Sequence, residues 1–245
     1  MNKKVIVITG GTTGIGFACA EYLLEKGYEV VITGRSEKNL NEALQKLNHQ
    51  ATGFVSDTAK LSDIDQLVDL LKEKYTKIDG LFVNAGIFKS SSFETTTEEL
   101  FDETMNINCK GAFFTTQKFV PILKNPSSVV LNTSIVVFKA FAGTSVYTAS
   151  KAAIESIAKV LNLELAPKGI RVNIISPGVT ESPIQKKSGM TDDAIKNLLE
   201  HFSNTSPIGR IVNPRDIAPI LEFLFSDSSM VLRNEKIVVD GGTTM

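Results

Sequence analysis

The chain has 245 residues, of which 42% are hydrophobic and 22% charged, and its formal net charge is −1. This is the composition of an ordinary globular protein; it carries no basic run that would bind nucleic acid and no apolar run long enough to span a membrane. The two cysteines, Cys19 and Cys109, stand far apart, and neither they nor the two histidines show metal-ligand spacing. We therefore expect reduced thiols, no metal site and a cytoplasmic location.

Strand-like runs alternate with helical patterns along the chain. Most of these runs are continuous and rich in Val and Ile, which is typical of strands covered by helices on both faces. In chain order, the predicted strands are Val5–Thr9, Glu29–Thr33, Gly53–Val55, Gly80–Val83, Ser128–Asn132, Arg171–Ile175 and Lys236–Val239. The predicted helices are Ile15–Lys26, Glu37–Lys46, Leu61–Lys74, Glu98–Leu123, Val146–Ala166 and Pro214–Leu224. The alternation predicts an α/β fold with a doubly wound parallel sheet of about seven strands, flanked by helices on both faces and forming one domain over residues 1–245.

Residues 179–213 depart from this regular alternation. They mix polar and apolar residues, and only Asp192–Phe202 has a helical pattern. An insertion of this length after a strand is usually functional or mobile. Because ligands of open α/β sheets bind at the carboxyl ends of the strands, the segment is predicted to be a substrate lid.

The run TGGTTGIG, from Thr9 to Gly16, follows the first predicted strand and opens the first predicted helix. Glycines at this point permit a tight turn and a close approach to a pyrophosphate, and the helix N-terminus offers free N–H groups. A glycine-rich turn can also be purely structural. The order of strand, turn and helix favours a dinucleotide site in a Rossmann-type fold.

The run YTASK places Tyr147 and Lys151 four residues apart, with Ser134 upstream. Four residues are about one helical turn, so the two side chains project from one face of a helix. A nearby ammonium favours the phenolate, and it would lower the pKa of Tyr147 from its usual ~10. Tyr147 would then be a usable general acid or base. In isolation such a pair is more often a surface feature of an amphipathic helix, but the glycine run favours catalysis.

The order of the motifs carries a family resemblance. They are TGxxxGIG from Thr9, NAG from Asn84 to Gly86, NxxG from Asn108 to Gly111, Ser134, YxxxK from Tyr147, and Pro177-Gly178. Together they resemble the short-chain dehydrogenase/reductase family in its compact single-domain branch. The runs GRIVNPRDIA and VVDGG extend the resemblance to the C-terminus. It implies an NAD(P)-dependent oxidoreductase that transfers a hydride between a nicotinamide dinucleotide and a carbonyl or secondary alcohol.

The resemblance also implies catalytic roles for four residues. Tyr147 would exchange a proton with the substrate oxygen, Ser134 would hydrogen-bond that same oxygen, and both would bind the substrate. Lys151 would lower the pKa of the tyrosine and hold the nicotinamide ribose. Asn108 would anchor a water that passes protons to Lys151, although an Asn here can instead compensate a helix kink before Gly111.

The implied cofactor site draws on several loops. Its residues are Gly10, Thr12, Thr13, Gly14, Ile15, Gly16, Arg35, Asp57, Asn84, Ala85, Gly86, Tyr147, Lys151, Pro177, Gly178, Thr180 and Ser182. Asp57 would bind the adenine amino group, or else serve as an ordinary loop aspartate. Thr180 would contact the nicotinamide carboxamide, at a position that is aliphatic in many relatives. The chain departs from the family pattern at Val137, where glycine is common, and at Asn234, which can adopt the left-handed conformation of a glycine.

The second predicted strand ends in TGRS, which bears on the choice of cofactor. Gly34 stands where an acidic residue normally binds the ribose 2′-hydroxyl of NAD, and Arg35 follows it. A missing carboxylate removes repulsion of a 2′-phosphate, and a guanidinium binds phosphate bidentately. We therefore favour NADP(H) over NAD(H). The alternative is that Arg35 stacks on adenine in an NAD enzyme, and Thr13 fills a position that is basic in some NADP-using relatives.

The substrate itself stays open. Apolar residues of the loops after the later strands either line a substrate pocket or pack the lid onto the body; they are Phe88, Phe93, Val137, Phe138, Phe141, Ile184, Met190, Ile195, Leu199 and Phe202. One specific alternative is a 3-oxoacyl-[acyl-carrier-protein] reductase, with Lys139, Lys168 and Arg171 assisting an acidic carrier. Another is a non-catalytic dinucleotide-sensing protein on the same fold. By resemblance we also expect a homo-oligomer, a tetramer or a dimer, paired through the helices predicted around 98–123 and 146–166.

Overall fold

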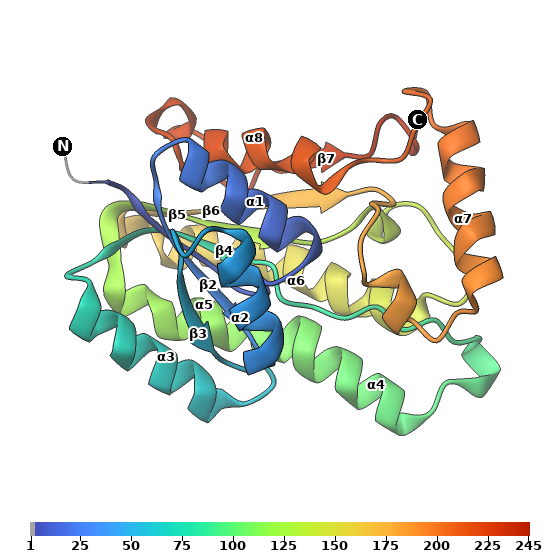
Figure 1. Cartoon of the computed structure of the whole chain (residues 1–245), viewed down its shortest axis with the longest axis horizontal. Coiled ribbons are helices and arrows are strands. Elements are labelled where there is room, and N and C mark those ends of the chain that lie inside the picture. The colour runs from blue at the N-terminus through green and yellow to red at the C-terminus, as the bar shows by residue number, and fades with distance from the viewer. Residues whose placement is uncertain (1–2) are drawn as a thin grey trace.

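The structure is a computed structural model that describes residues 3–245, so residues 1 and 2 of the predicted domain lie outside the described part. Within it, seven strands form one parallel sheet in the order β3-β2-β1-β4-β5-β6-β7 (Figure 1). The order of connection reverses between β1 and β4, which is the switch point where such sheets bind ligands. The predicted doubly wound α/β fold is confirmed.

The elements follow the predicted alternation. The strands are β1 Val5–Ile8, β2 Glu29–Gly34, β3 Thr52–Val55, β4 Ile78–Val83, β5 Leu123–Asn132, β6 Ile170–Pro177 and β7 Lys236–Val239. The helices are α1 Gly14–Glu25, α2 Glu37–Lys46, α3 Leu61–Lys74, α4 Glu98–Met105, α5 Ala112–Phe119, α6 Ser145–Glu164, α7 Asp192–Thr205 and α8 Pro214–Phe225. Within residues 3–245, no helix combines the length and the apolar character that a membrane crossing requires.

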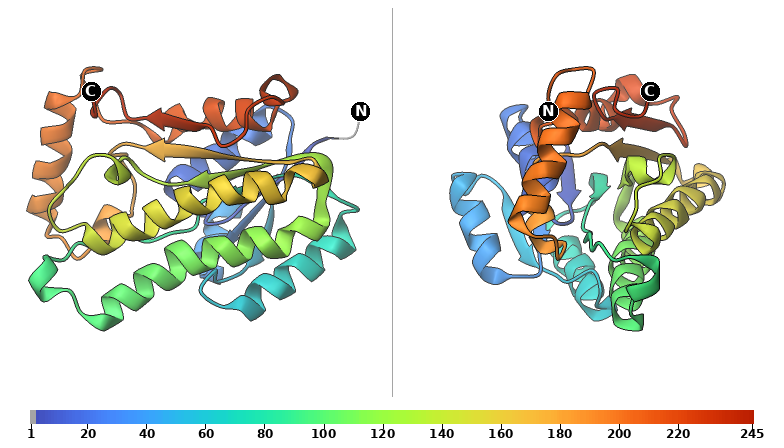
Figure 2. Two further views of the ribbon diagram at one scale, coloured as in Figure 1. Left: turned by 180° about the vertical axis from the view of Figure 1, so that it is seen from behind. Right: turned by 90° about the vertical axis from the view of Figure 1, so that its right-hand side faces the viewer.

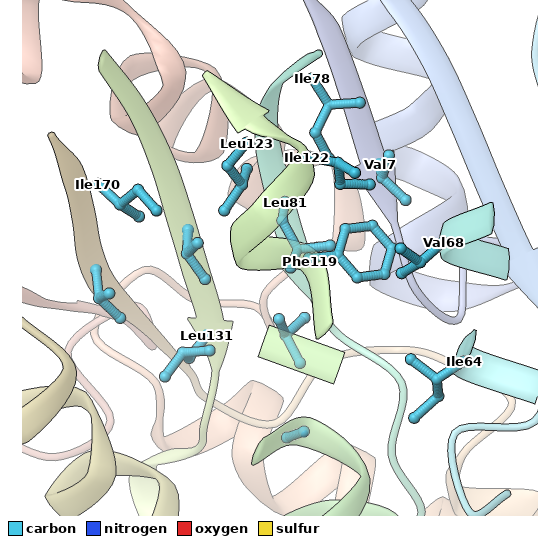
Figure 3. Packing of buried hydrophobic residues seen from close by; sticks show 14 of the residues in the cluster. Val7, Ile64, Val68, Ile78, Leu81, Phe119, Ile122, Leu123, Leu131 and Ile170 are labelled. Atoms are coloured by element: carbon cyan, nitrogen blue, oxygen red, sulfur yellow. The ribbon is translucent and has the colours of Figure 1, made fainter. Parts of the chain in front are cut away.

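Helices cover both faces of the sheet (Figure 2), and each face has its own hydrophobic core. Successive side chains of a strand point to opposite faces. In β1, Val7 therefore packs into the core of α3, α5 and α6 with Phe119 (Figure 3), whereas Ile8 packs into the core of α1, α2 and α8 with Leu221. Full burial of each such side chain contributes about 1.5–3 kcal/mol, so this continuous apolar strand anchors both layers.

The helix predicted over 98–123 is not continuous. A π-helical segment, η2 (Asn106–Gly111), separates α4 from α5. At Gly111 an added Cβ would lie 2.7 Å from the carbonyl oxygen of Thr58, so the helix passes close to the loop after β3. Such π segments are frequent at functional sites. Here the segment carries Asn108 in a buried position beside the loop after β4.

The segment 179–213 leaves the sheet after β6 and returns to it. Thr180 and Val212, near its two ends, form an isolated parallel β-bridge. Between them α7 stands across the end of the sheet, at the right of Figure 1, and buries Ile195 and Phe202. The predicted lid is thus a loop closed at its base, with one amphipathic helix turned toward the body.

Candidate active site

The carboxyl ends of the strands open into a cavity of about 830 Å³. Its walls come from the loops after β1 to β6 and from α7, at the edge where open α/β sheets bind ligands. Every predicted cofactor and catalytic residue lines this cavity except Gly16 and Asn108. The lining predicted residues are Gly10, Thr12, Thr13, Gly14, Ile15, Arg35, Asp57, Asn84, Ala85, Gly86, Ser134, Tyr147, Lys151, Pro177, Gly178, Thr180 and Ser182.

The glycine turn borders the cavity with backbone. At Gly10, which has a φ of +66°, an added Cβ would lie 2.9 Å from the Cα of Ala85. At Gly16 it would lie 2.4 Å from the carbonyl oxygen of Gly10, so Gly16 closes the turn from behind. Among the described residues, the side chain of Thr13 makes no capping hydrogen bond to α1. The first N–H groups of α1 are therefore available to a ligand, and with the positive end of the helix dipole they fit a pyrophosphate.

Asn84 ties this turn to the middle of the sheet. Its amide nitrogen donates to the carbonyl oxygens of Thr9 (2.9 Å) and Gly10 (3.1 Å). Its amide oxygen accepts from Nδ2 of Asn132 at the end of β5 (2.9 Å). The backbone carbonyl of Asn132 in turn accepts from Nζ of Lys151 (2.8 Å). One chain of hydrogen bonds thus connects the glycine turn with the predicted catalytic lysine.

The far rim of the cavity lies at the end of β2. Gly34 is buried there, and an added Cβ would lie 2.5 Å from Cγ2 of Thr12, so Thr12 occupies the space that an acidic side chain would need. Arg35 is exposed beside it. Ser36 caps α2 by accepting from the backbone N–H of Asn39 (3.3 Å), and both residues line the cavity. This rim offers a cation, a hydroxyl and an amide to a ligand.

The loops after β3 and β6 hold their predicted residues by local hydrogen bonds. Asp57 accepts from the backbone N–H of Ala59 (3.0 Å), so its carboxylate has a turn-forming role in addition to facing the cavity. The carbonyl oxygen of Thr180 accepts from Nε2 of Gln185 (2.7 Å), and Ser182 donates to Oε1 of Gln185 (3.3 Å). Gln185, which the sequence did not single out, therefore fixes the start of the lid.

Tyr147 and Lys151 project from one face of α6, as predicted from their spacing. The ammonium of Lys151 lies 5.7 Å from the centroid of the Tyr147 ring. Ser134 follows β5 and lies beside the phenol of Tyr147, where its hydroxyl favours the ionised form of the phenol and so acts to lower its pKa. The ring of Phe88 meets that of Tyr147 edge-on, with the centroids 5.0 Å apart. The cluster combines two hydroxyls and a cation in a pocket with an aromatic wall.

Burial has the largest effect on the pKa values of Tyr147 and Lys151. It raises the pKa of Tyr147 to about 12, with the hydrogen bond from Ser134 acting in the opposite direction. It lowers the pKa of Lys151 to about 8. The prediction that Lys151 lowers the pKa of Tyr147 is therefore wrong for this structure. The lysine is itself desolvated, and its ammonium donates to the carbonyl of Asn132.

Asn108 lies behind the cavity wall. Its amide oxygen accepts from the backbone N–H of Ile87 (2.8 Å), and its nitrogen donates to the carbonyl of Ile87 (2.9 Å) and to Oγ of Ser150 (3.2 Å). An added Cβ at Gly86 would be 3.1 Å from Oδ1 of Asn108 and 3.5 Å from Nζ of Lys151. Asn108 thus holds the loop after β4 while lying close to the lysine, and both predicted roles fit its position.

The apolar wall contains half of the predicted residues. Phe88, Phe141, Ile184, Met190 and Phe202 line the cavity. Of the others, Phe93, Val137, Phe138, Ile195 and Leu199 do not line it. The wall also includes Leu198 and Val136, which the sequence did not single out. Leu198 stands four residues before Phe202, so the helical period of α7 contained the signal.

Two further residues of the wall carry charge. Lys89, in the loop after β4, forms an ion pair with Glu103 of α4, and both line the cavity.

Arg171, which the sequence suggests as an aid in binding a carrier protein, is only 5% exposed. Its guanidinium donates to the carbonyl oxygens of Ser229 (2.7 Å) and Leu224 (3.1 Å). That proposal is wrong for Arg171, because a buried side chain bound to backbone does not reach a partner.

Comparisons with known proteins give a consistent result. The family model described as enoyl-(acyl carrier protein) reductase matches residues 10–244. The chain is 35% identical to human (Homo sapiens) dehydrogenase/reductase SDR family member 4, over 98% of this chain and 87% of that protein. The crystal structure of a 3-ketoacyl-(acyl-carrier-protein) reductase from Brucella melitensis complexed with NADH superimposes with a TM-score of 0.90 at 28% identity, covering 99% of this chain and 98% of that one. A variant of actinorhodin polyketide ketoreductase with NADPH does so with a TM-score of 0.90 at 26% identity, covering 98% and 97%.

Proposed function

Because the chain belongs to the short-chain dehydrogenase/reductase family, we propose that Tyr147, Ser134, Lys151 and Asn108 reduce a carbonyl substrate with NADP(H) in the cavity at the strand ends. The chain is an NAD(P)-dependent oxidoreductase, and it transfers a hydride between a nicotinamide dinucleotide and a carbonyl or secondary alcohol. The observation that carries the assignment of residues is the cluster of Ser134, Tyr147 and Lys151 between the glycine turn and the apolar wall.

Each residue of the cluster has one task. A nicotinamide dinucleotide held at the strand ends would supply the hydride. Tyr147 donates its phenolic proton to the substrate oxygen, which gains negative charge as the carbonyl is reduced. The hydroxyl of Ser134 hydrogen-bonds the same oxygen and stabilises the developing charge from a fixed position.

Lys151 and Asn108 restore the proton. Lys151 lies beside Tyr147, with its ammonium 5.7 Å from the centroid of the ring, and so it is placed to return a proton to the phenol. With its pKa lowered to about 8, Lys151 is also able to release a proton near neutral pH. Asn108 holds the loop beside Lys151, and this position supports a role in guiding protons to the lysine.

The end of β2 supports a preference for NADP(H) over NAD(H). Thr12 fills the space beside Gly34 that an acidic residue would need to bind a ribose 2′-hydroxyl. Arg35, Ser36 and Asn39 line the same rim, and a guanidinium together with a hydroxyl suits the oxygens of a 2′-phosphate.

The wall supports a carbonyl substrate with an apolar body. Phe88, Phe141, Met190, Leu198 and Phe202 line the cavity, and the ring of Phe88 meets that of Tyr147 edge-on. A second candidate is a 3-oxoacyl thioester on an acyl carrier protein, which is supported by the likeness to the 3-ketoacyl-(acyl-carrier-protein) reductase from Brucella melitensis.

A substrate screen tests the function. Ketones, sugars and acyl thioesters are incubated with NADPH or NADH, and oxidation of the reduced cofactor is followed by its absorbance. We expect turnover of an apolar ketone or thioester, faster with NADPH. Tight cofactor binding without turnover of any compound would contradict the assignment and favour a sensing role.

Three broader features belong to the proposal. The described residues 3–245 form one domain with a substrate lid at 179–213, and the bridge between Thr180 and Val212 supports this lid. The protein is a homotetramer or a dimer, a state supported by the exposed apolar side chains of Phe101 on α4 and of Val160 and Leu163 on α6. It is cytoplasmic, in keeping with the free thiols of its cysteines. Sedimentation tests the second feature, because a monomer at micromolar concentration would contradict it.

A further inference from the structure

A buried carboxylate lies beneath the catalytic cluster. Glu155 stands one turn beyond Lys151 on α6, and the residue is only 9% exposed. Its Oε1 accepts from Oγ1 of Thr133 (3.1 Å) and lies 3.4 Å from Oγ of Ser176. Its Oε2 accepts from Nζ of Lys236 on β7 (3.1 Å). One side chain thus joins α6 to the ends of β5 and β6 and to β7.

The hydroxyls in this network form a directed chain. Oγ of Ser176 and Oγ1 of Thr133 are 2.6 Å apart, and both residues are buried. If Ser176 donates to Thr133, Thr133 is free to donate to Glu155, and each hydroxyl has a partner. The backbone N–H of Thr133 also donates to the carbonyl of Ile175 (2.8 Å). Thr133 is therefore held from both its backbone and its side chain.

The network contacts both ends of one short segment, residues 133–138, which contains Ser134. Thr133 directly precedes Ser134. At the other end, Nζ of Lys236 lies 4.6 Å from the centroid of the Phe138 ring, a cation–π contact. Between them the turn Ile135–Val137 carries Ser134 as its N-cap, with Oγ accepting from the backbone N–H of Val136 (3.4 Å). Glu155 binds Thr133 and Lys236, and so it connects the two ends.

Net stability gives little reason for a carboxylate at this place. The cost of removing a buried ion pair from water largely offsets its attraction, and apolar replacements are often neutral or stabilising. The buried carboxylate instead fixes the positions of the groups that it binds. Such positions matter, because displacing a reacting group by about 1 Å lowers the rate by as much as about 100-fold.

We propose that Glu155 is a positioning residue that sets the place of Ser134 relative to Tyr147 by holding Thr133 and Lys236. The proposal rests on the proposed function of Ser134. The sequence alone does not indicate this role for Glu155, because a charged residue in an amphipathic helix is normally assigned to the solvent face. Its spacing of four from Lys151 places it on the buried face instead.

A double-mutant cycle tests the proposal. Glu155→Gln keeps the shape of the side chain but removes its charge and presents an N–H₂ group to one of its present donors. We expect kcat to fall about 10- to 100-fold while the Kd of NADPH stays within about twofold of wild type. In the Ser134→Ala background, Glu155→Gln should change kcat by less than about threefold, because the serine through which it acts is gone. Glu164→Gln, an exposed position on the same helix, is the matched control and should leave kcat unchanged.

Two results would overturn the proposal. One is an equal fold-loss of kcat in both backgrounds, which indicates general destabilisation; the other is a Glu155→Gln variant with wild-type kcat. If Glu155→Gln does not fold, Thr133→Val takes its place in the cycle, and Thr133→Ser should restore kcat by retaining the hydroxyl. A failure of the proposed function looks different, because Ser134→Ala alone would then keep wild-type kcat.

Discussion

Replacing Arg35 by alanine separates two explanations of how this residue would act on the choice between NADP(H) and NAD(H). Arg35 lies at the rim formed with Ser36 and Asn39, where Thr12 excludes an acid at position 34. If the guanidinium binds the 2′-phosphate, Arg35→Ala weakens only the phosphorylated cofactor. If it stacks on adenine, which both cofactors carry, the variant weakens both.

The magnitude follows from the exposure of Arg35. Hydrogen bonds to charged groups contribute about 1.5–3 kcal/mol, and an exposed pair belongs at the lower end. About 1.5 kcal/mol corresponds to roughly a tenfold rise in Kd for NADPH, with the Kd for NADH unchanged. Stacking alone contributes about 0.5–1 kcal/mol, so it predicts an equal loss of roughly two- to fivefold for both cofactors.

Fluorescence titration of both reduced cofactors measures the two constants. Lys38→Ala is the matched control, because Lys38 is an exposed cation on α2 that does not line the cavity. It should leave the ratio of the two Kd values near that of wild type. Equal weakening of NADPH and NADH by Arg35→Ala would refute the phosphate assignment.

Other predictions follow from local geometry and burial. Gly34→Asp should weaken the binding of both cofactors, because the new Cβ would lie 2.5 Å from Cγ2 of Thr12. The double variant Gly34→Asp/Thr12→Gly has room for the carboxylate and should shift the preference toward NADH in the same fluorescence titration. The expected left-handed conformation of Asn234 is confirmed by its φ of +55°. Asn234→Ala should lower the free energy of unfolding by about 1 kcal/mol in urea titrations, whereas Asn234→Gly should not. The pKa of Lys151 is lowered to about 8 in the folded protein, so between pH 8 and its unfolded value near 10.5 the unfolded chain binds more protons. Wild type should therefore gain stability over Lys151→Met as the pH rises through this window, and urea midpoints at pH 8 and pH 10 that show no relative gain would contradict the burial effect. Burial raises the pKa of Tyr147 to about 12, so its contribution to stability is present below pH 10 and lost above it, and Tyr147→Phe should lose less stability than wild type between pH 10 and pH 12.

The sequence was sufficient where a short local pattern determines the structure. The run of Val and Ile in β1 predicts a strand buried on both faces, and the glycines after it predict a turn that only glycine fits at Gly10 and Gly16. The spacing of Tyr147 and Lys151 predicts their shared helix face. Each of these inferences uses residues within one or two turns of chain.

The sequence was insufficient where distant contacts decide. The π segment at 106–111 lies where Gly111 approaches the loop after β3, and no local pattern in the sequence indicates that approach. β5 begins at Leu123 rather than Ser128, because Leu123 pairs with Ile78 although the following Asn125 and Pro126 are exposed. The pKa of Tyr147 depends on how deeply α6 packs against the rest of the protein. Burial raises this pKa, whereas the spacing from Lys151 alone predicts that it is lowered.

In the proposed reaction, the phenolic hydroxyl of Tyr147 delivers the proton to the substrate oxygen. Single-turnover reduction by Tyr147→Phe, followed by the loss of NADPH absorbance, tests it most directly, with the Kd of NADPH and the unfolding midpoint measured on the same protein. We expect a rate lowered by about 10²- to 10⁴-fold, the usual contribution of general acid catalysis, with cofactor binding and folding preserved. A Tyr147→Phe protein that reduces the substrate at nearly the wild-type rate would contradict it.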